Sequence, residues 1–559
     1  MCPSASAANE RSRDRLYTHR MTPGRAIILL ALAVILGLPL VLGSRTDRPP
    51  PGDDALTLII ITPHVRQIQQ EFADAFDRWH RREHARPVRI DYRRPGGTSE
   101  ILKQLQAQFN AALASNRYDV LPDGRVVLHR GAITFDLMFG GGSYDHTRLK
   151  AGDGVSVILP GGAVPTPVSM SVPAGFDQRI LDGWYGENAI GSGFLYDPDQ
   201  HWLGTALSSF GIVYSRDTVH RLLGRRDLET FDELADPRLA GWIALADPRQ
   251  SGSITTTFDA ILSRYGWHDG WRLLRAMCAN TRYFTNSSTK PPIDVSQGEA
   301  AAGLAIDFYG RTQAQVVMRP GETPETSRVG YADPPGAVYV DADPVSILNG
   351  APSPDLARRF VEFCLTDEAQ ALWNFHATTT PAGAANPKGP DARPLGPTAH
   401  ELRRMPVRRD FYDRYASFLI DKANPFDIAS TTPSAGWRSA IGLMMGAFAV
   451  DNLHDIRAAW LAMHRARERG VPPGALAEME RLFYAFPEPD QVARLWRSLF
   501  GDAAPPCPDN ALLPFTPENY PAVRAAWRDP AVLARLRIVY TSAFRENYRA
   551  ILRMAEEHH

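Results

Sequence analysis

Four short loops in the sequence carry residue types that could bind an anion. They are Thr62–His64, Pro95–Glu100, Gly140–Ser143 and Asp247–Ser253. Each follows an apolar run that is typical of a strand, and three of them precede apolar residues at helical spacing. The first N–H groups of a helix have no partner within it and the helix dipole is positive there, so an anion is favoured. Any one of these loops alone could be an ordinary turn, but their repetition indicates a ligand site.

Two other motifs could indicate an enzyme, and their surroundings support neither. Ser287 and Lys290 have the Ser-x-x-Lys spacing of serine acyl enzymes, but no Lys-Thr-Gly follows them. His80 and His84 lie four residues apart, but the order around Glu83 is not His-Glu-x-x-His and arginines surround them. We therefore expect no enzyme. A hydrolase built on the same scaffold is the alternative, because function depends on the site rather than on the fold.

The loops need strands and helices to position them, and the hydrophobic pattern predicts both. The predicted strands are Leu58–Ile61, Val88–Tyr92, Thr134–Phe139, Trp202–Tyr214, Trp242–Ala246, Leu304–Gly310 and Val338–Asp341. Thr62 and Pro63 are expected to cap and open the first helix, with His64 in its first turn. Thr98 or Ser99 is expected to cap the second helix. Strands that alternate with helices favour a parallel sheet, in which ligands bind beyond the carboxyl ends of the strands.

The composition is that of a globular protein that can bury a core. Of the 559 residues, 44% are apolar and 22% are charged, and the formal net charge of −1 argues against a nucleic-acid partner. The length suffices for two or three domains. The cysteines at positions 2, 278, 364 and 507 fit no zinc motif. Buried free thiols are expected at Cys278 and Cys364, and a bridge between them is the alternative in an oxidising compartment.

The N-terminus has the pattern of an exported protein. Basic residues in the stretch 1–25 precede an uncharged apolar run at residues 26–43, and the positive side of such a run stays in the cytoplasm. The run approaches the ~20 residues that span a bilayer, so it is either an uncleaved anchor or a signal peptide cut after Gly43. Residues 44–55 contain three successive prolines and are expected to form an extended linker.

Taken in order, several segments resemble the extracellular solute-binding proteins of ABC importers, in the branch similar to ferric-iron-binding proteins. They are His64 in Thr-Pro-His, Pro95–Glu100, Phe139–Gly142, Trp202 with Ser208–Gly211, Asp247–Pro248 with Ser251–Ser253, Ala305–Tyr309 and Gly350–Pro352. The likeness covers about residues 56 to 375. It implies an α/β, two-lobed type II periplasmic binding protein fold that closes on a ligand by a hinge motion. It also implies a monomer in the periplasm or on the extracytoplasmic face of the membrane, with an ABC permease as partner.

The resemblance and the predicted elements together set the expected domain boundaries. Lobe 1 is expected to contain residues 56–207 with 338–385, and lobe 2 residues 208–337. Leu356–Phe375 is predicted to be one amphipathic helix. Residues 398–559 are predicted to form a helical C-terminal extension, whose apolar stripes should pack on a lobe rather than form a partner surface.

The resemblance also implies which residues bind the solute. The expected ligand-binding residues are His64, Gly97, Thr98, Gly141, Gly142, Trp202, Ser208, Ser209, Ser251, Gly252, Ser253, Asp307 and Tyr309. Ferric-binding relatives commonly offer a histidine in the first loop and two consecutive tyrosines in the second lobe, but here Phe308 replaces one tyrosine.

Two kinds of transported ligand therefore stay open. One is Fe(III), held by His64, Asp307 and Tyr309, because carboxylate and phenolate are both hard oxygen ligands. The other is a small anionic organic solute, held by backbone N–H groups and hydroxyls without a metal. Neither alternative requires a further cofactor.

Residues after Arg45 are predicted to lie outside the cytoplasmic membrane, because basic residues precede the apolar run. A reporter enzyme that works only in the cytoplasm, fused after Phe375, should therefore be inactive in cells. The same fusion without residues 1–43 should be active, and an active full-length fusion would contradict this topology.

Overall fold

The computed structural model describes residues 54–159, 161–501 and 505–558. The predicted basic N-terminus, the apolar run at residues 26–43, Cys2 and most of the linker lie outside these ranges. Within them, no helix is both long enough and apolar enough to cross a bilayer. The predicted α/β fold of two lobes with a helical C-terminal region is confirmed by the elements described below.

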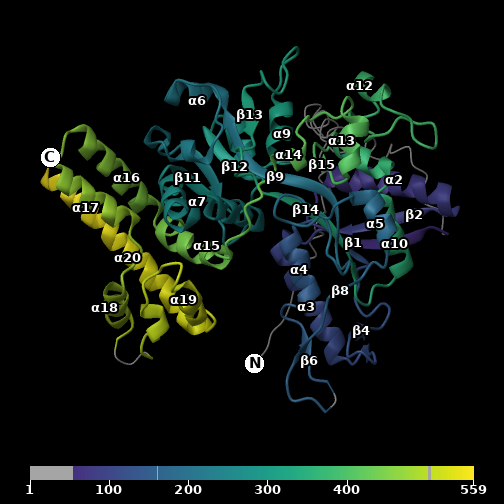
Figure 1. Ribbon diagram of the computed structural model, residues 1–559, viewed down its shortest axis with the longest axis horizontal. Helices are drawn as coiled ribbons and strands as arrows, with labels where there is room; N and C mark the ends of the chain where they lie inside the picture. The colour runs from purple at the N-terminus through teal and green to yellow at the C-terminus, as the bar shows by residue number, and fades with distance from the viewer. Residues whose placement is uncertain (1–53, 160, 502–504, 559) are drawn as a thin grey trace, which may run out of the picture. The chain divides into compact units, whose positions relative to one another are not determined.

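One mixed sheet runs through the two lobes, in the order β11-β10-β12-β9-β14-β5-β1-β2 (Figure 1). Its strands are β1 (Leu56–Ile61), β2 (Val88–Arg93), β5 (Leu137–Phe139), β9 (Leu203–Ser215), β10 (Ile243–Ala246), β11 (Thr281–Thr285), β12 (Ala302–Ile306) and β14 (Val340–Leu348). Three further strands pair beside this path: β8 (Ser171–Val172), β13 (Val329–Ala332) and β15 (Met405–Pro406). Hairpins β3–β4 (Tyr118–Val120, Val126–Leu128) and β6–β7 (Ser156–Val157, Thr166–Pro167) form small separate sheets.

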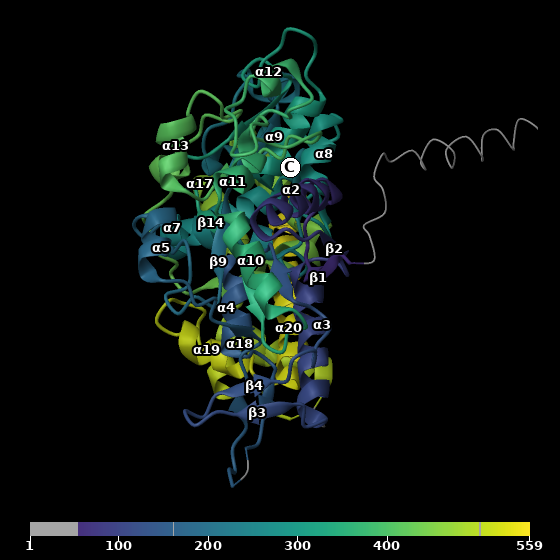
Figure 2. The ribbon, with the colours of Figure 1, turned by 90° about the vertical axis from the view of Figure 1, so that its right-hand side faces the viewer.

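Two long strands, β9 and β14, pair antiparallel and lie side by side in the middle of the structure (Figure 2). All 13 residues of β9 are buried. Its first part, Leu203–Ser209, pairs with β14, and its second part, Phe210–Tyr214, pairs with β12. Below, lobe 1 means β1, β2, β5 and β14 with the helices packed on them, and lobe 2 means β10 to β13 with theirs. The sheet is therefore continuous from one lobe to the other.

Helices cover both lobes. Those of lobe 1 are α2 (Arg66–His84), α3 (Thr98–Ala114), α4 (Ser143–Ala151), α5 (Gln178–Tyr185), α10 (Pro354–Cys364) and α11 (Asp367–Asn374). Those of lobe 2 are α6 (Arg216–Leu223), the 3₁₀ turns η1 (Phe231–Ala235) and η2 (Pro237–Leu239), α7 (Gly252–Ala279), α8 (Lys290–Ser296) and α9 (Asp307–Val316). The predicted single helix Leu356–Phe375 is divided into two helices. α10 ends at Cys364 with Leu365 as its C-cap, and Thr366 caps α11 by accepting the N–H of Ala369 (3.3 Å).

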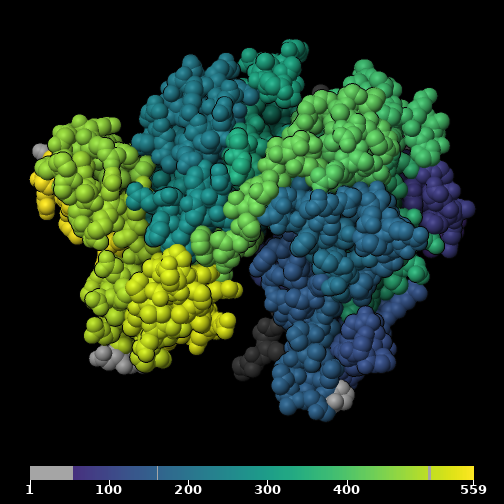
Figure 3. All heavy atoms as spheres, in the orientation of Figure 1, coloured from purple at the N-terminus to yellow at the C-terminus, as the bar shows by residue number. Residues whose placement is uncertain are grey.

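The segment after residue 380 returns to lobe 1, which the helical prediction for residues 398–559 did not foresee. It contains three short helices, α12 (Pro381–Ala384), α13 (Arg409–Tyr415) and α14 (Pro425–Ile428), and strand β15, which pairs with β9. Phe375 of lobe 1 shares a small core with Phe411 and Leu419 of this segment. In Figure 3 this green segment lies over the part of the chain drawn in purple and blue.

A buried carboxylate fixes the same segment to lobe 1. Glu71 on α2 is 2% exposed and accepts the backbone N–H groups of Thr398 (2.6 Å), Ala399 (2.9 Å) and His400 (2.9 Å). Hydrogen bonds to an ionised acceptor are stronger than neutral ones. The contact therefore joins residues 398–400 to a helix more than 300 positions earlier in the chain.

The remaining chain, residues 434–501 and 505–558, is called the C-terminal helical region below. It contains α15 (Arg438–Met445), a π-helical turn η3 (Gly446–Val450), α16 (Leu453–Glu468), α17 (Pro473–Tyr484), α18 (Pro489–Phe500), η4 (Asp509–Leu512), α19 (Tyr520–Ala526) and α20 (Pro530–Glu557). As the apolar stripes predicted, it packs on a lobe: Phe258 and Trp271 of α7 lie in one core with Phe448 and Phe544. Cys278 is a free thiol in this core.

A buried arginine strengthens the junction between α7 and the C-terminal helical region. Arg275 is 1% exposed and donates from Nη1 to the carbonyl oxygens of Phe483 and Ala485, both at 2.8 Å. Its guanidinium carbon lies 4.8 to 5.0 Å from the ring centres of three phenylalanines, at positions 448, 486 and 544. Aromatic faces attract a cation, so the rings partly replace the water that Arg275 gives up. Cys364 lies in the separate core of lobe 1 and is also free, so the alternative bridge to Cys278 is not formed.

Glu71→Ala should lower the free energy of unfolding by about 2–4 kcal/mol, because three backbone N–H groups lose a charged acceptor. Urea denaturation followed by circular dichroism measures this loss. Glu83→Ala on the same helix is the matched control, since its side chain is 46% exposed, and it should cost less than about 0.5 kcal/mol. Equal effects of the two substitutions would show that Glu71 does not hold residues 398–400.

Candidate functional site

The first loop differs from its prediction. Helix α2 begins at Arg66 with Val65 as its N-cap, so Thr62 and Pro63 do not open it and His64 precedes it. The reason is a distant contact: Thr62 Oγ1 donates to the carbonyl oxygen of Phe139 (2.6 Å) and accepts the N–H of His64 (3.0 Å). The hydroxyl thus joins the loop after β1 to the loop after β5.

His64 is a buried, neutral imidazole. It is 4% exposed, and its Nε2 lies 3.0 Å from Asp343 Oδ2. Burial, followed by the charges of Arg404 and Arg94, lowers the pKa of His64 well below its ordinary value. A neutral imidazole that donates Nε2–H to the carboxylate keeps an acceptor lone pair on Nδ1, and that atom has no partner among the described residues. Gly140 must be glycine here, because a Cβ at its φ of +93° would lie 2.4 Å from His64 Nε2.

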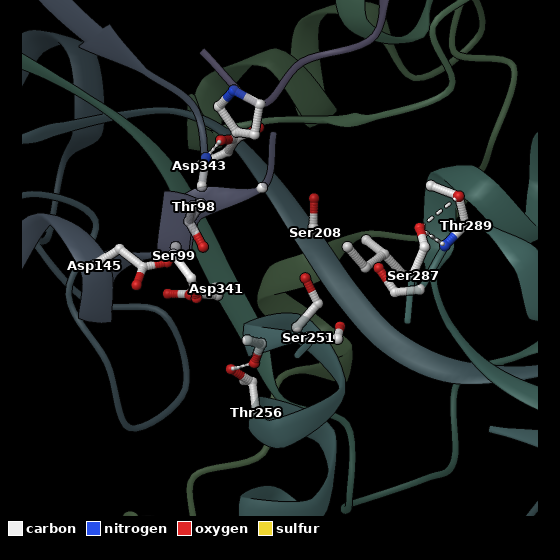
Figure 4. A pocket seen from close by; sticks show the side chains of 18 of the residues that line it. Thr98, Ser99, Asp145, Ser208, Ser251, Thr256, Ser287, Thr289, Asp341 and Asp343 are labelled. Carbon is white, nitrogen blue, oxygen red and sulfur yellow. Dashed lines mark hydrogen bonds between the residues drawn. The ribbon is translucent and has the colours of Figure 1, made fainter. Parts of the chain in front are cut away.

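Helices α3 and α7 begin at the same cavity, one from each lobe. Gly97 is the N-cap of α3 and provides no side chain, so Thr98 and Ser99 lie in the first turn and do not cap it. Ser251 caps α7 by accepting the N–H of Ile254 (3.4 Å). A Cβ added to Gly252, the first residue of α7, would lie 3.7 Å from Thr98 Oγ1. The two N-termini therefore face each other at close range (Figure 4).

The glycine loop before α4 differs from these two helix starts. The N–H of Gly141 is donated to Asp343 Oδ1 (2.9 Å) and that of Ser143 to Asp341 Oδ2 (3.2 Å). Burial raises the pKa of Asp341 to about 6. Carboxylates of β14 thus accept backbone N–H groups of a loop that was predicted to bind a solute. This pairing could not be predicted from local patterns, because β14 lies about 200 positions downstream.

The cavity between the lobes has a volume of about 590 Å³. The predicted ligand residues that line it are His64, Gly97, Thr98, Gly141, Gly142, Ser208, Ser251, Gly252, Ser253 and Tyr309. In Figure 4, Ser208 of β9 lies between Thr98 on one side and Ser287 on the other, and Ser251 and Thr256 lie below it. The structure therefore gathers most of the predicted residues, although their contact with a solute stays a prediction.

Three predicted residues do not line the cavity: Trp202, Ser209 and Asp307. Trp202 is in the core of lobe 1. Ser209 follows Ser208 on β9 and so points to the opposite face, where its hydroxyl donates to Asp333 Oδ1 (2.6 Å).

Asp307 is fully buried at the start of a helix instead of facing the cavity from a strand. The predicted strand Leu304–Gly310 stops at Ile306, and α9 begins at Asp307. The carboxyl is fully buried without a hydrogen-bond partner among the described residues. Burial raises its pKa to about 7, against the opposing charge of Arg311.

The structure thus brings two members of the predicted Fe(III) set, His64 and Tyr309, to one cavity wall and turns Asp307 away from it. The described residues contain no group of three or more His, Cys, Asp or Glu side chains placed to hold a metal ion. Phe308, which replaces the second tyrosine, lies under the guanidinium of Arg404 at 3.9 Å.

Five cations on the cavity wall were missed by the sequence reasoning: Arg94, Lys103, Arg249, Arg404 and Arg438. Arg404 forms an ion pair with Asp343, and Arg249 pairs with Asp247 and Asp451. The described residues offer no ion-pair partner to the other three. Charged residues outside a recognised motif look like surface residues in a sequence, and two of these five come from beyond residue 400.

Comparison with known proteins agrees with the predicted resemblance. Residues 192–399 match the model of a family described as bacterial extracellular solute-binding protein. An uncharacterized protein of Haemophilus influenzae is 28% identical over 146 residues, which are 25% of this chain and 38% of that protein. Iron uptake protein A2 of Synechocystis sp. is 25% identical over 203 residues, which are 35% of this chain and 56% of that protein. The chain therefore spans about half or less of the length of these relatives.

Among solved structures, the periplasmic binding protein AfuA of Actinobacillus pleuropneumoniae, determined with exogenous fructose-6-phosphate bound, is 16% identical. The similarity has a TM-score of 0.44 and covers 70% of this chain and 97% of that one. The resemblance to extracellular solute-binding proteins predicted above is confirmed over residues 192–399. The mixed sheet of two lobes with a helical C-terminal region agrees with the architecture that this resemblance implied.

Asp307→Asn should stabilise the protein at high pH and not at low pH. Because the pKa of Asp307 is raised, the folded state keeps its proton up to about pH 7, whereas the unfolded state loses it near pH 4. The free energy of unfolding of the wild type therefore falls as the pH rises from about 4 to about 7, and above that range Asp307 causes no further change. Urea unfolding measures the free energy of unfolding of Asp307→Asn minus that of the wild type. This difference should be larger at pH 8 than at pH 4.5 by roughly 2–4 kcal/mol.

The control for this experiment is Asp217→Asn, an exposed substitution on α6, which should change either measurement by less than about 0.5 kcal/mol. A difference between Asp307→Asn and wild type that is the same at both pH values would show that Asp307 is not held neutral by burial.

Proposed function

We propose that the protein is the solute-binding receptor of an ABC importer outside the cytoplasm, and that its solute is a small organic anion such as a phosphate ester, a phosphonate or a carboxylate. The observation that carries this proposal is the close approach of the α3 and α7 N-termini, with the Cβ position of Gly252 3.7 Å from Thr98 Oγ1. An anion between them would accept N–H groups from both lobes. Its binding would therefore favour the closed arrangement of the lobes.

The size and charge of the cavity favour an organic anion. A volume of about 590 Å³ suits a molecule of many atoms. Four acidic residues, Glu100, Asp145, Asp341 and Asp343, line the cavity together with the five cations. Of these cations, Arg94 and Lys103 add positive charge on the side of lobe 1 without an ion-pair partner among the described residues. The hydroxyls of Ser208 and Ser253 add neutral hydrogen-bonding groups that could recognise the rest of the solute.

Delivery to a membrane permease and a location outside the cytoplasm are part of the same proposal. The match of residues 192–399 to extracellular solute-binding proteins supports them, and so does the basic and apolar pattern of residues 1–43. The chain is expected to act as a monomer.

Fe(III) is the second candidate solute, and the environment of His64 favours it. Its Nε2 is held by Asp343 at 3.0 Å while its Nδ1 has no partner among the described residues. Histidines that bind metals commonly donate their other ring N–H to a carboxylate in this way. Tyr309 lines the same cavity. Iron would then be accompanied by a small anion at the starts of α3 and α7.

Gly252→Pro should weaken the binding of an anion about 10- to 100-fold, because proline removes an N–H that would bind a charged acceptor. Proline is compatible with the first helical position, and Ser251 already has the extended conformation (φ −120°, ψ 109°) that must precede it. Isothermal titration calorimetry with inorganic phosphate, glucose-6-phosphate and citrate measures the loss.

Gly252→Ala is the matched control, because it retains the N–H and its Cβ would make only ordinary contacts. It should bind each probe within about threefold of wild type. Equal affinities of Gly252→Pro and Gly252→Ala for the anions would show that the N–H at the α7 N-terminus does not bind the solute.

Mass spectrometry and metal analysis of the material released from gently purified protein would separate the two solutes. An organic anion without stoichiometric iron supports the first, and iron with a small anion supports the second. The alternative of a hydrolase is tested on the same samples, because an enzyme would convert the bound molecule during prolonged incubation whereas a receptor would return it unchanged.

A further inference from the structure

The C-terminal helical region places one arginine at the ligand cavity. Arg438, the first residue of α15, donates from Nη1 to Thr256 Oγ1 (2.9 Å) and from Nη2 to the carbonyl oxygen of Gly252 (3.1 Å). Both partners lie in the first two turns of α7. The guanidinium is thus held beside the N-terminus of α7, and it lines the cavity.

The same guanidinium reaches lobe 1. Its carbon lies 4.6 Å from the ring centre of Tyr144, which is on α4. The Tyr144 side chain is half exposed, so only part of the attraction between the cation and the ring is expected. Arg438 is therefore hydrogen-bonded to lobe 2 and stacked on lobe 1, although it belongs to neither.

Arg438 forms no ion pair among the described residues, whereas the cavity residues Arg249 and Arg404 are both paired with aspartates. Burial raises the pKa of the nearby carboxyls of Asp145, Asp259 and Asp341, and the charge of Arg438 opposes this rise. A guanidinium has five N–H donors, and the two hydrogen bonds to α7 leave others for a ligand. A planar cation with free donors is well suited to a phosphate or a carboxylate.

The position of Arg438 is fixed by the core beneath it. Ile441 and Met444 of α15 are buried in the same core as Phe258 of α7. Trp437, next to Arg438, packs edge-on against Trp267 at 5.1 Å. The guanidinium is therefore positioned before a solute arrives, which reduces the entropy cost of using it.

A second cavity cation depends on the same region. Arg249 donates from Nη1 to both carboxylate oxygens of Asp451 at 3.0 Å. The aliphatic part of the Arg249 side chain lies along two glycines of the C-terminal helical region. A Cβ on Gly442 would be 3.7 Å from Arg249 Cγ, and a Cβ on Gly446 would be 3.2 Å from Arg249 Cδ. The C-terminal helical region thus both supplies one cation to the cavity and orients another.

We propose that Arg438 is an anion-binding residue of the interlobe site, so that the C-terminal helical region is part of the receptor's ligand site. This inference rests on the proposed function, since it requires an anionic solute. The ligand class is a phosphate or carboxylate group that sits at the starts of α3 and α7 and also contacts the guanidinium of Arg438.

The test uses the full chain and three variants, Arg438→Gln, Arg438→Lys and Arg553→Gln. Arg553 is an exposed cation on α20 and serves as the control for charge. Affinities for inorganic phosphate, glucose-6-phosphate and citrate are measured by calorimetry. Arg438→Gln should bind at least about tenfold more weakly than wild type, Arg438→Lys should be intermediate, and Arg553→Gln should differ by less than about twofold.

Salt dependence separates contact with the anion from support of α7. If Arg438 acts through its charge, the gap between wild type and Arg438→Gln should shrink when the salt concentration rises from about 0.05 M to about 0.5 M. A loss that came only from a distorted α7 would persist unchanged at high salt and would overturn the proposal.

The remaining outcomes distinguish the two proposals. Wild type that binds a probe no more tightly than Arg438→Gln overturns the role of Arg438 and leaves the proposed function intact. Wild type that binds none of the anions overturns both. If Arg438→Gln does not fold, Arg438→Lys decides, because equal affinity of Arg438→Lys and wild type for both phosphate probes would exclude a guanidinium contact.

Discussion

The candidate site depends on a general property of helices, namely that their first N–H groups cannot be satisfied within the helix. The protein meets this requirement in two different ways around one cavity. At α4, the carboxylates of Asp341 and Asp343 accept the N–H groups of the glycine loop. At α3, no side chain caps the helix, and at α7 the cap Ser251 accepts only the N–H of Ile254. The unsatisfied N–H groups of α3 and α7 are what a solute can use, and they come from different lobes.

Strand pairing is what allows two lobes to present these N-termini to each other. β9 exchanges its partner from β14 to β12 between Ser209 and Phe210, so a single buried strand belongs to both halves of the sheet. Gly204 and Gly211 of β9 leave no room for a side chain. A Cβ on Gly204 would lie 2.5 Å from the carbonyl oxygen of Leu195, and a Cβ on Gly211 would lie 2.2 Å from the carbonyl oxygen of Ala332. Any closing motion must therefore occur by bending paired strands rather than by separating them.

Local patterns predicted the strands well, because an apolar run reports burial without reference to distant residues. The errors arose where a distant partner decides the local structure. Thr62 was expected to cap a helix, but Phe139 engages its hydroxyl. Asp307 was expected to face the ligand, but β12 ends at Ile306 and Asp307 is buried as the first residue of α9. Arg404 and Arg438 come to the cavity from the segment that looked like an appendage, and no sequence spacing connects them with loops hundreds of residues earlier.

Two contacts limit the order in which the protein can fold. Glu71 binds residues 398–400 by hydrogen bonds, and α7 shares a core with α20. Lobe 1 lacks strand β15 and part of its packing until the ribosome has passed residue 420, and lobe 2 lacks most of one core until α20 is made. During synthesis from the N-terminus, neither half can finish folding early. The cavity between the lobes therefore stays incomplete until nearly all of the chain has been made.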